Sequence, residues 1–176
     1  MKKLTLIALA AVIMMIPSFA SAQTASGTLT VTATVNGSIN LVFNSDAAGV
    51  ALASGAGTNA ATLAFGNVSA FGAVAAGVVR TTTATTFTVS SAVDVLVSKT
   101  NSASANYTLK AQLGAADAVN TWQVGGIAVT SAAQSTVTAT GTYAANSNFP
   151  VAITVPFTTA SGTVISNTIN YQATAN

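Results

Sequence analysis

The sequence predicts an all-β fold, a sandwich of about nine or ten short strands, and three observations indicate it. First, residues 23–176 contain 27 Thr and 19 Val, whose Cβ-branched side chains lose rotamer freedom in helices and pack well on a pleated sheet. Second, apolar and polar residues alternate with a period of two in several segments. Third, breaks rich in Gly, Asn and Ser separate many of these segments, at the spacing typical of sandwiches.

The beginning of the chain is expected to be an export signal rather than part of this fold. It opens with two lysines, continues with an almost unbroken apolar run over residues 4–16, and closes on an A-x-A cleavage site ending at Ala22. The apolar run is shorter than the ~20 residues that a membrane-spanning helix needs. We therefore expect a signal peptide over residues 1–22, a single β-sandwich domain over residues 23–176, and no membrane span in the mature chain.

The clearest strand is expected at Thr28–Val35, where apolar residues alternate with threonines. Successive side chains of a strand point to opposite faces, so this segment has one apolar and one hydroxyl-bearing face. Asn36-Gly37 then signals a turn, and a second strand is expected at Ile39–Phe43. The apolar positions of the first strand are Leu29, Val31, Ala33 and Val35.

The remaining strands follow from the same alternation and from the breaks between them. Pro156 has no N–H, so its strand is expected to lie at a sheet edge or to end there. Asn44–Ala61 is rich in Ala, Gly and Ser and is expected to be a long loop, and Phe71–Val79 is a second one. The expected strands are Thr62–Val68, Val78–Val89, Val93–Ser98, Ala105–Leu113, Thr121–Thr130, Thr136–Tyr143, Val151–Phe157 and Thr163–Ala173.

The mature chain carries few reactive side chains. It contains no Cys, His or Glu, and its net charge is zero. Most enzymes draw their acids, bases, nucleophiles and metal ligands from the missing residue types. We therefore expect no enzyme, no cofactor and no metal site and, because no basic patch remains, no nucleic-acid partner. The charged side chains of the mature chain are Arg80, Lys99, Lys110, Asp46, Asp94 and Asp117.

Two details of this charge pattern bear on function. A hydrolase built on the aspartates needs two of them close together, and nothing in the sequence places any two together, so we expect solvated surface carboxylates. Soluble proteins usually block exposed sheet edges with Lys, Pro or inward charges, whereas this domain has only six charged residues. Such a surface favours strand-to-strand contact with another copy. The Thr28–Val35 strand suits that role, although it equally suits completing its own sheet.

Three segments resemble a known family. Ser26–Val35 resembles the first strand of secreted pilin-like subunits of the spore coat protein U and archaic chaperone–usher class. Leu63-Ala-Phe-Gly66 is similar to the L-x-F-G element that follows their first long loop, and Ser161–Tyr171 resembles their closing strand. Those proteins usually have a cysteine soon after the first strand, where this chain has Asn36-Gly37-Ser38. The resemblance implies an immunoglobulin-like fold, export to the cell surface and polymerisation by donated strands.

Together these observations predict a secreted structural or adhesive cell-surface protein, a fibre or pilus-like subunit that passes through the periplasm in transit. Its assembly strand would place Leu29, Val31, Ala33 and Val35 in a groove of a neighbouring subunit. The alternative is a non-catalytic extracellular module that binds a polysaccharide. That alternative predicts that Trp122 or a tyrosine lies exposed on a flat face as the ligand-stacking aromatic, whereas a tryptophan in a sandwich is typically a core residue.

Overall fold

A computed structural model describes residues 26–176 of the chain, so the signal peptide expected over residues 1–22 lies outside the described residues. The described chain is all-β, with eleven strands and no helix. The compact unit runs from Val35 to Asn176, and residues 26–34 belong to a separate unit. No segment within residues 26–176 forms a helix of the length and apolarity that crossing a membrane requires.

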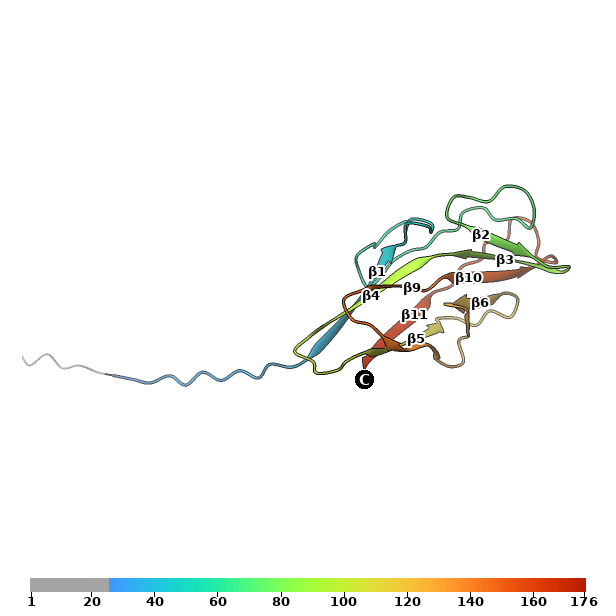
Figure 1. Ribbon diagram of the computed structural model, residues 1–176. Helices are drawn as coiled ribbons and strands as arrows, with labels where there is room; N and C mark the ends of the chain where they lie inside the picture. The colour runs from blue at the N-terminus through green and yellow to red at the C-terminus, as the bar shows by residue number, and fades with distance from the viewer. Residues whose placement is uncertain (1–25) are drawn as a thin grey trace, which may run out of the picture. The chain divides into compact units, whose positions relative to one another are not determined.

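The strands form three antiparallel sheets in the orders β1-β4-β9, β2-β3-β10-β6-β7 and β11-β5-β8 (Figure 1). They are β1 (Ser38–Ser45), β2 (Val79–Thr82), β3 (Thr86–Ser91), β4 (Val93–Thr100), β5 (Tyr107–Leu113), β6 (Thr121–Val124), β7 (Ile127–Val129), β8 (Ser135–Gly141), β9 (Asn146–Asn148), β10 (Val151–Pro156) and β11 (Ile169–Ala175).

The first two sheets are continuous at a bend. Only Ala92 separates β3 from β4, and only Phe149 and Pro150 separate β9 from β10. The backbone N–H of Phe149 donates to the carbonyl of Val93 at 2.9 Å, which carries the pairing across the bend. The β11-β5-β8 sheet supplies the second side of the core, because its β5 residues share both core clusters with β3, β4, β6 and β10.

The core has two neighbouring parts. The larger part contains the buried Phe87, Val89, Trp122, Val124 and Ile153 together with the end of β5. The smaller part is formed by Val95, Val97, Tyr107 and Leu109, all of which are fully buried. Alternate residues of β5 are buried along its whole length, as a strand with one face on the core requires.

Most of the expected strands are confirmed. Val78–Val89 contains the two strands β2 and β3, and Thr121–Thr130 contains β6 and β7. The second division falls at Gly125-Gly126, where φ is +57° and +80°, and such positive values suit glycine in a tight hairpin turn. Pro156 ends β10, as expected, although β10 is a central strand of its sheet. Its pairing with β6 stops at Thr154. The missing N–H of Pro156 therefore removes no hydrogen bond to β6.

Within the compact unit, two expected strands differ from the structure: Thr62–Val68 is a loop, and so is the first part of Thr163–Ala173. In addition, β9 is a strand that was not expected. In the first loop Phe65 and Val68 pack against the larger core cluster without sheet pairing. These apolar side chains are thus partly buried although they lie in a loop. The alternation of apolar and polar residues alone does not distinguish such a loop from a strand.

Candidate functional site: an open groove between the first and last strands

The strands β1 and β11 are the edge strands of two different sheets. β1 pairs with β4, and β11 pairs with β5, but within residues 26–176 neither has a strand on its other side. The two approach closely without sheet pairing: the rings of Phe43 and Tyr171 are 5.0 Å apart between centroids in an edge-on arrangement. We call the space between these strands the β1–β11 groove.

The free edge of β11 presents backbone groups ready for pairing. At its two ends, Gly114 N–H donates to Thr168 O at 2.7 Å, and Asn176 N–H donates to Asn106 O at 3.1 Å, so even-numbered residues are bonded toward β5. In an antiparallel ladder the residues between them point their N–H and C=O groups the other way. These residues are Ile169, Tyr171, Ala173 and Ala175, and they line the unpaired edge.

The groove has apolar walls and a core floor. On β1 the half-buried Leu41 and Phe43 lie opposite Val97 and Val95 in the register with β4. On β11 the half-buried Tyr171 and Ala173 pack on the same smaller core cluster. Burial raises the pKa of the Tyr171 phenol well above its ordinary value. The residues of β1 and β11 that border the groove are therefore apolar and half-buried, and they pack on a fully buried cluster.

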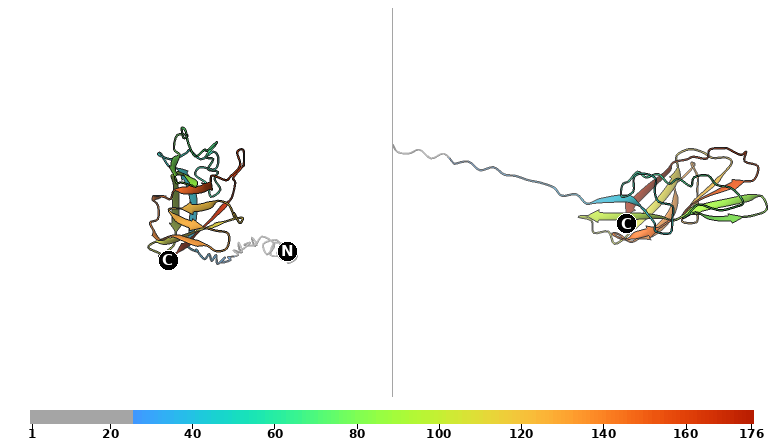
Figure 2. Two further views of the ribbon diagram at one scale, coloured as in Figure 1. Left: turned by 90° about the vertical axis from the view of Figure 1, so that its right-hand side faces the viewer. Right: turned by 90° about the horizontal axis from the view of Figure 1, so that it is seen from above.

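The two ends of the groove differ. At one end the start of β1 and the end of β11 border an open depression of about 400 Å³, which Gly37, Ile39, Asn101 and Ala175 help to line. Figure 2 shows the C-terminus beside the start of β1 at this end. At the other end the outer edge of β1 is occupied, because Phe43 N–H donates to Thr58 O at 2.8 Å and Gly57 N–H donates to Phe43 O at 2.7 Å.

The prediction of a strand at Thr28–Val35 is wrong. It forms no strand in the structure, and all of its residues are exposed: the exposed fractions of Leu29, Val31 and Val35 are 89%, 81% and 73%. Asn36-Gly37 makes no turn either, and the chain continues directly into β1. The segment therefore alternates in sequence but is not part of a strand within the described residues.

The aromatic residues proposed for carbohydrate stacking are not available for that role. Trp122 is only 5% exposed, and its Nε1–H donates to Asp117 Oδ2 at 2.8 Å. Tyr107 is fully buried, and Tyr143 and Tyr171 are half-buried. The expectation of Trp122 as a ligand aromatic is thus corrected: sheet pairing with Ile153 and Val129 places it in the core.

The most exposed aromatic side chains within residues 26–176 lie in loops and were not among the candidate ligand aromatics. Phe71 is 72% exposed and Phe157 is 39% exposed, and their ring centroids are 5.9 Å apart. The loop that carries Phe71 is fixed by Arg80, whose guanidinium donates to Ser69 O at 2.8 Å and to Gly72 O at 2.7 Å. The sequence signal was an aromatic residue within a run of small residues at 70–77.

The structure brings two aspartates together, contrary to expectation. Asn148 Nδ2 donates to Asp46 Oδ2 at 2.7 Å and to Asp94 Oδ1 at 3.5 Å. Burial, and then the nearby charge of Asp46, raise the pKa of Asp94, whereas hydrogen bonds from Ala48 and Asn148 lower the pKa of Asp46. These side chains come from β4, β9 and the residue that follows β1, so we assign the cluster to holding the ends of these strands together.

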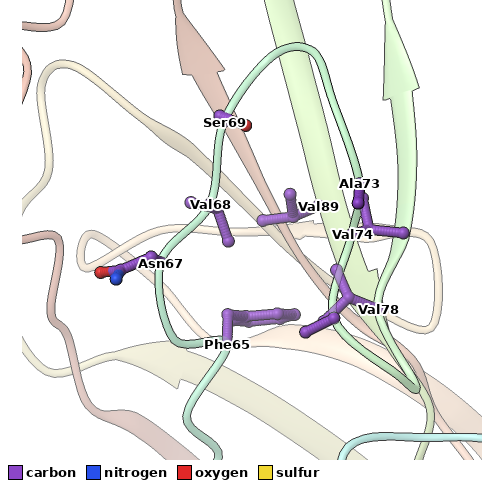
Figure 3. Close-up of a pocket in the computed structure, with 9 residues that line it drawn as sticks. Phe65, Asn67, Val68, Ser69, Ala73, Val74, Val78 and Val89 are labelled. Atoms are coloured by element: carbon purple, nitrogen blue, oxygen red, sulfur yellow. The ribbon is translucent and has the colours of Figure 1, made fainter.

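Two further kinds of site find no support in the described residues. No group of three or more Asp, Glu, His or Cys side chains that could hold a metal ion occurs within residues 26–176. The cavity beneath the loop at Phe65, Val68 and Val78 has a volume of about 10 Å³ (Figure 3), which is the space of one water molecule. This cavity is too small for an organic ligand.

Asp117 gives the fold a testable pH dependence. Desolvation acts to raise its pKa, but hydrogen bonds from the Asn120 backbone, the Trp122 indole, the Asn120 side chain and Val119 outweigh it and lower the pKa to about 2. A carboxyl group whose folded pKa is depressed adds stability above its unfolded pKa, and this stability is lost as pH falls through the folded value.

We therefore expect the urea midpoint of the mature chain to fall between about pH 4 and about pH 2, and to fall less steeply in the Asp117→Asn variant. The measurement is urea unfolding followed by Trp122 fluorescence over a pH series. The variant keeps Asp46 and Asp94, so their titration is common to both proteins. Parallel pH curves for the two proteins would contradict the role of Asp117.

Comparison with known protein families, with curated proteins and with solved structures finds no match for this chain. Its function is therefore inferred from the β1–β11 groove and from the exposed segment that precedes β1.

Proposed function

We propose that this protein is a secreted structural subunit of a cell-surface fibre, which polymerises by strand donation. Residues 28–35 of one copy form the missing strand beside β11 of another copy. One observation carries the proposal: the domain has an unpaired β11 edge beside apolar side chains that pack on the core, while residues 28–35 of the same chain alternate between apolar and polar side chains and are exposed.

The donated segment and the groove agree in chemistry and length. The segment is uncharged, with apolar residues on one face and threonines on the other, and the groove is apolar on its walls and floor. Four apolar positions from Leu29 to Val35 meet four edge positions of β11 from Ile169 to Ala175. Insertion would bury the apolar face, worth about 1.5–3 kcal/mol for each Val or Leu, and would give the β11 edge its missing hydrogen bonds, each worth about 1 kcal/mol.

The register of the chain disfavours the same strand folding back onto its own domain. A two-residue hairpin turn at Asn36-Gly37 would pair Val35 with Ser38 and hence Ala33 with Asn40. Asn40 is exposed and lies on the outer face of β1, so this register would turn the apolar residues outward and the threonines toward the core. A shift of one residue reverses the faces of a strand.

A three-residue turn restores the faces but needs unsuitable residues. It would require a left-handed conformation at its third position, which here is Ser38, while the glycine stands at the second position. Gly37 also has an ordinary negative φ in the structure, and a Cβ there would overlap the carbonyl of Asn101. Pairing with a second copy has neither restriction.

The test uses the mature chain, residues 23–176. Negative-stain microscopy and size-exclusion chromatography should show filaments or a ladder of oligomers. A synthetic peptide of residues 26–36, added in excess, should shorten the ladder by occupying the groove, whereas the same peptide with Val31→Asp should not. A chain that stays monomeric at every concentration and does not bind the peptide would refute strand donation.

A further inference from the structure

The β1–β11 groove is open at the end lined by Gly37 and Ala175 and obstructed toward its other end, at the level of Phe43 and Tyr171. Along β11 the edge positions toward the C-terminus are the small Ala173 and Ala175, whereas Tyr171 is bulky. The Tyr171 ring meets Phe43 of β1 at 5.0 Å, with an angle of 67° between the ring planes. A strand entering from the open end meets this ring pair, and because Gly57 and Thr58 are hydrogen-bonded to the outer edge of β1 at the same level, the strand pairs there with β11 alone.

The apolar face of the donated segment has the complementary shape. Three of its four positions are branched side chains, and the fourth, Ala33, is a single methyl group. In antiparallel alignment with β11 over the full length, Ala33 falls beside Tyr171, Val31 beside Ala173, and Leu29 beside Ala175. In parallel alignment the large residues meet instead, with Leu29 beside Ile169 and Val31 beside Tyr171, while Ala33 faces Ala173. Close packing favours large against small.

We infer that Ala33 of one copy is seated against the Phe43–Tyr171 ring pair of a second copy, and that this contact determines the direction and register of the donated strand. The inference rests on the proposed function. Ile39 lies near Ala175 and Phe43 lies near Tyr171, so β1 runs opposite to β11. Phe43 therefore adds to the contact from the side of β1. A strand antiparallel to β11 therefore runs parallel to β1 and brings Ala33 to the level of both rings.

The direction decides what kind of assembly forms. In the inferred alignment the donated strand leaves the groove at Ile169, so the start of β1 in the donor copy meets the opposite end of the acceptor domain. Such a head-to-tail contact does not close and generates a filament. In the parallel alignment the strand leaves at Ala175, beside the start of β1 in the acceptor. Like ends would then meet, and two copies would close into a dimer.

The first test enlarges the side chain at Ala33 and then shortens the side chain at Phe43. Ala33→Leu should lower the rate of filament growth about tenfold or more, because the added side chain overlaps the ring pair. Thr32→Leu adds a similar side chain on the opposite face and should leave growth unchanged. Combining Ala33→Leu with Phe43→Ala makes room for the leucine and should restore growth. Wild-type growth in the Ala33→Leu variant would overturn the inference.

The second test reads the alignment directly and does not depend on the stability of the Phe43 variant. The chain contains no cysteine, so introduced pairs are unambiguous. Residues directly opposite in a hydrogen-bonded antiparallel pair have Cα atoms about 5.5 Å apart, which suits a disulfide. After oxidation, Leu29→Cys with Ala175→Cys should give covalent oligomers, and Leu29→Cys with Ile169→Cys should not.

The outcomes separate this inference from the proposed function. If the wild-type chain forms no oligomer and binds no 26–36 peptide, strand donation itself is refuted, and the inference with it. If the wild-type chain assembles but the Ile169 pair cross-links, or neither pair does, strand donation stands and the seat of Ala33 is overturned.

Discussion

Replacing Val31 with Asp is expected to abolish polymerisation of the mature chain and to leave the domain folded. Val31 is 81% exposed in the single chain, so the fold does not depend on it. In the assembled state the new carboxylate would lie between the apolar walls of the groove without a partner. Burying an unpaired charge costs at least about 3 kcal/mol, equivalent to a more than about hundredfold loss of affinity.

The matched control for this variant is Thr32→Asp. It adds the same charge one residue away, on the face that points out of the groove. Filament formation, followed by light scattering and microscopy, should be lost in Val31→Asp and retained in Thr32→Asp, with equal thermal unfolding of both monomers. Equal loss in both variants would indicate an effect of net charge alone, and retained assembly in Val31→Asp would rule out the mechanism.

Replacing Trp122 with Ala is expected to lower the free energy of unfolding by about 3–5 kcal/mol, the usual range for a large aromatic residue removed from a core. Trp122 is 5% exposed and lies in β6 between β10 and β7. Its loss opens a cavity in the larger core cluster and also removes a donor to Asp117. Urea unfolding followed by far-ultraviolet circular dichroism measures the change without relying on tryptophan emission.

Two companion variants separate packing from hydrogen bonding. Trp122→Phe keeps most of the apolar contact but removes the bond to Asp117, so it should lose about 1.5–3 kcal/mol. Val119→Ala changes a side chain that is 60% exposed and should stay within about 0.5 kcal/mol of the wild type. An unchanged urea midpoint in Trp122→Ala would contradict the placement of this side chain in the core.

For most of the strands, the local alternation of apolar and polar residues was sufficient to predict the element and the face that it buries. The alternation in Ala105–Leu113 predicted a strand, and β5 buries alternate residues there. The same reasoning identified the apolar face of residues 28–35 but wrongly made this segment a strand, because a strand also needs a neighbouring edge. The strand predicted at Thr62–Val68 was wrong for a related reason: its apolar residues lie in a loop that packs on the core, where they are partly buried.

The groove itself required the tertiary structure. Leu41 and Tyr171 are far apart in the sequence, and no local period indicates that they line one slot. Asp46 and Asp94 likewise meet only because β1 pairs with β4. The sequence alone determined the strand-forming residues, the low charge and the alternating segment before β1, since these depend on side-chain chemistry and on a period of two. Which edges remain unpaired depends on the order of strands in the sheets, and long-range packing decides that order.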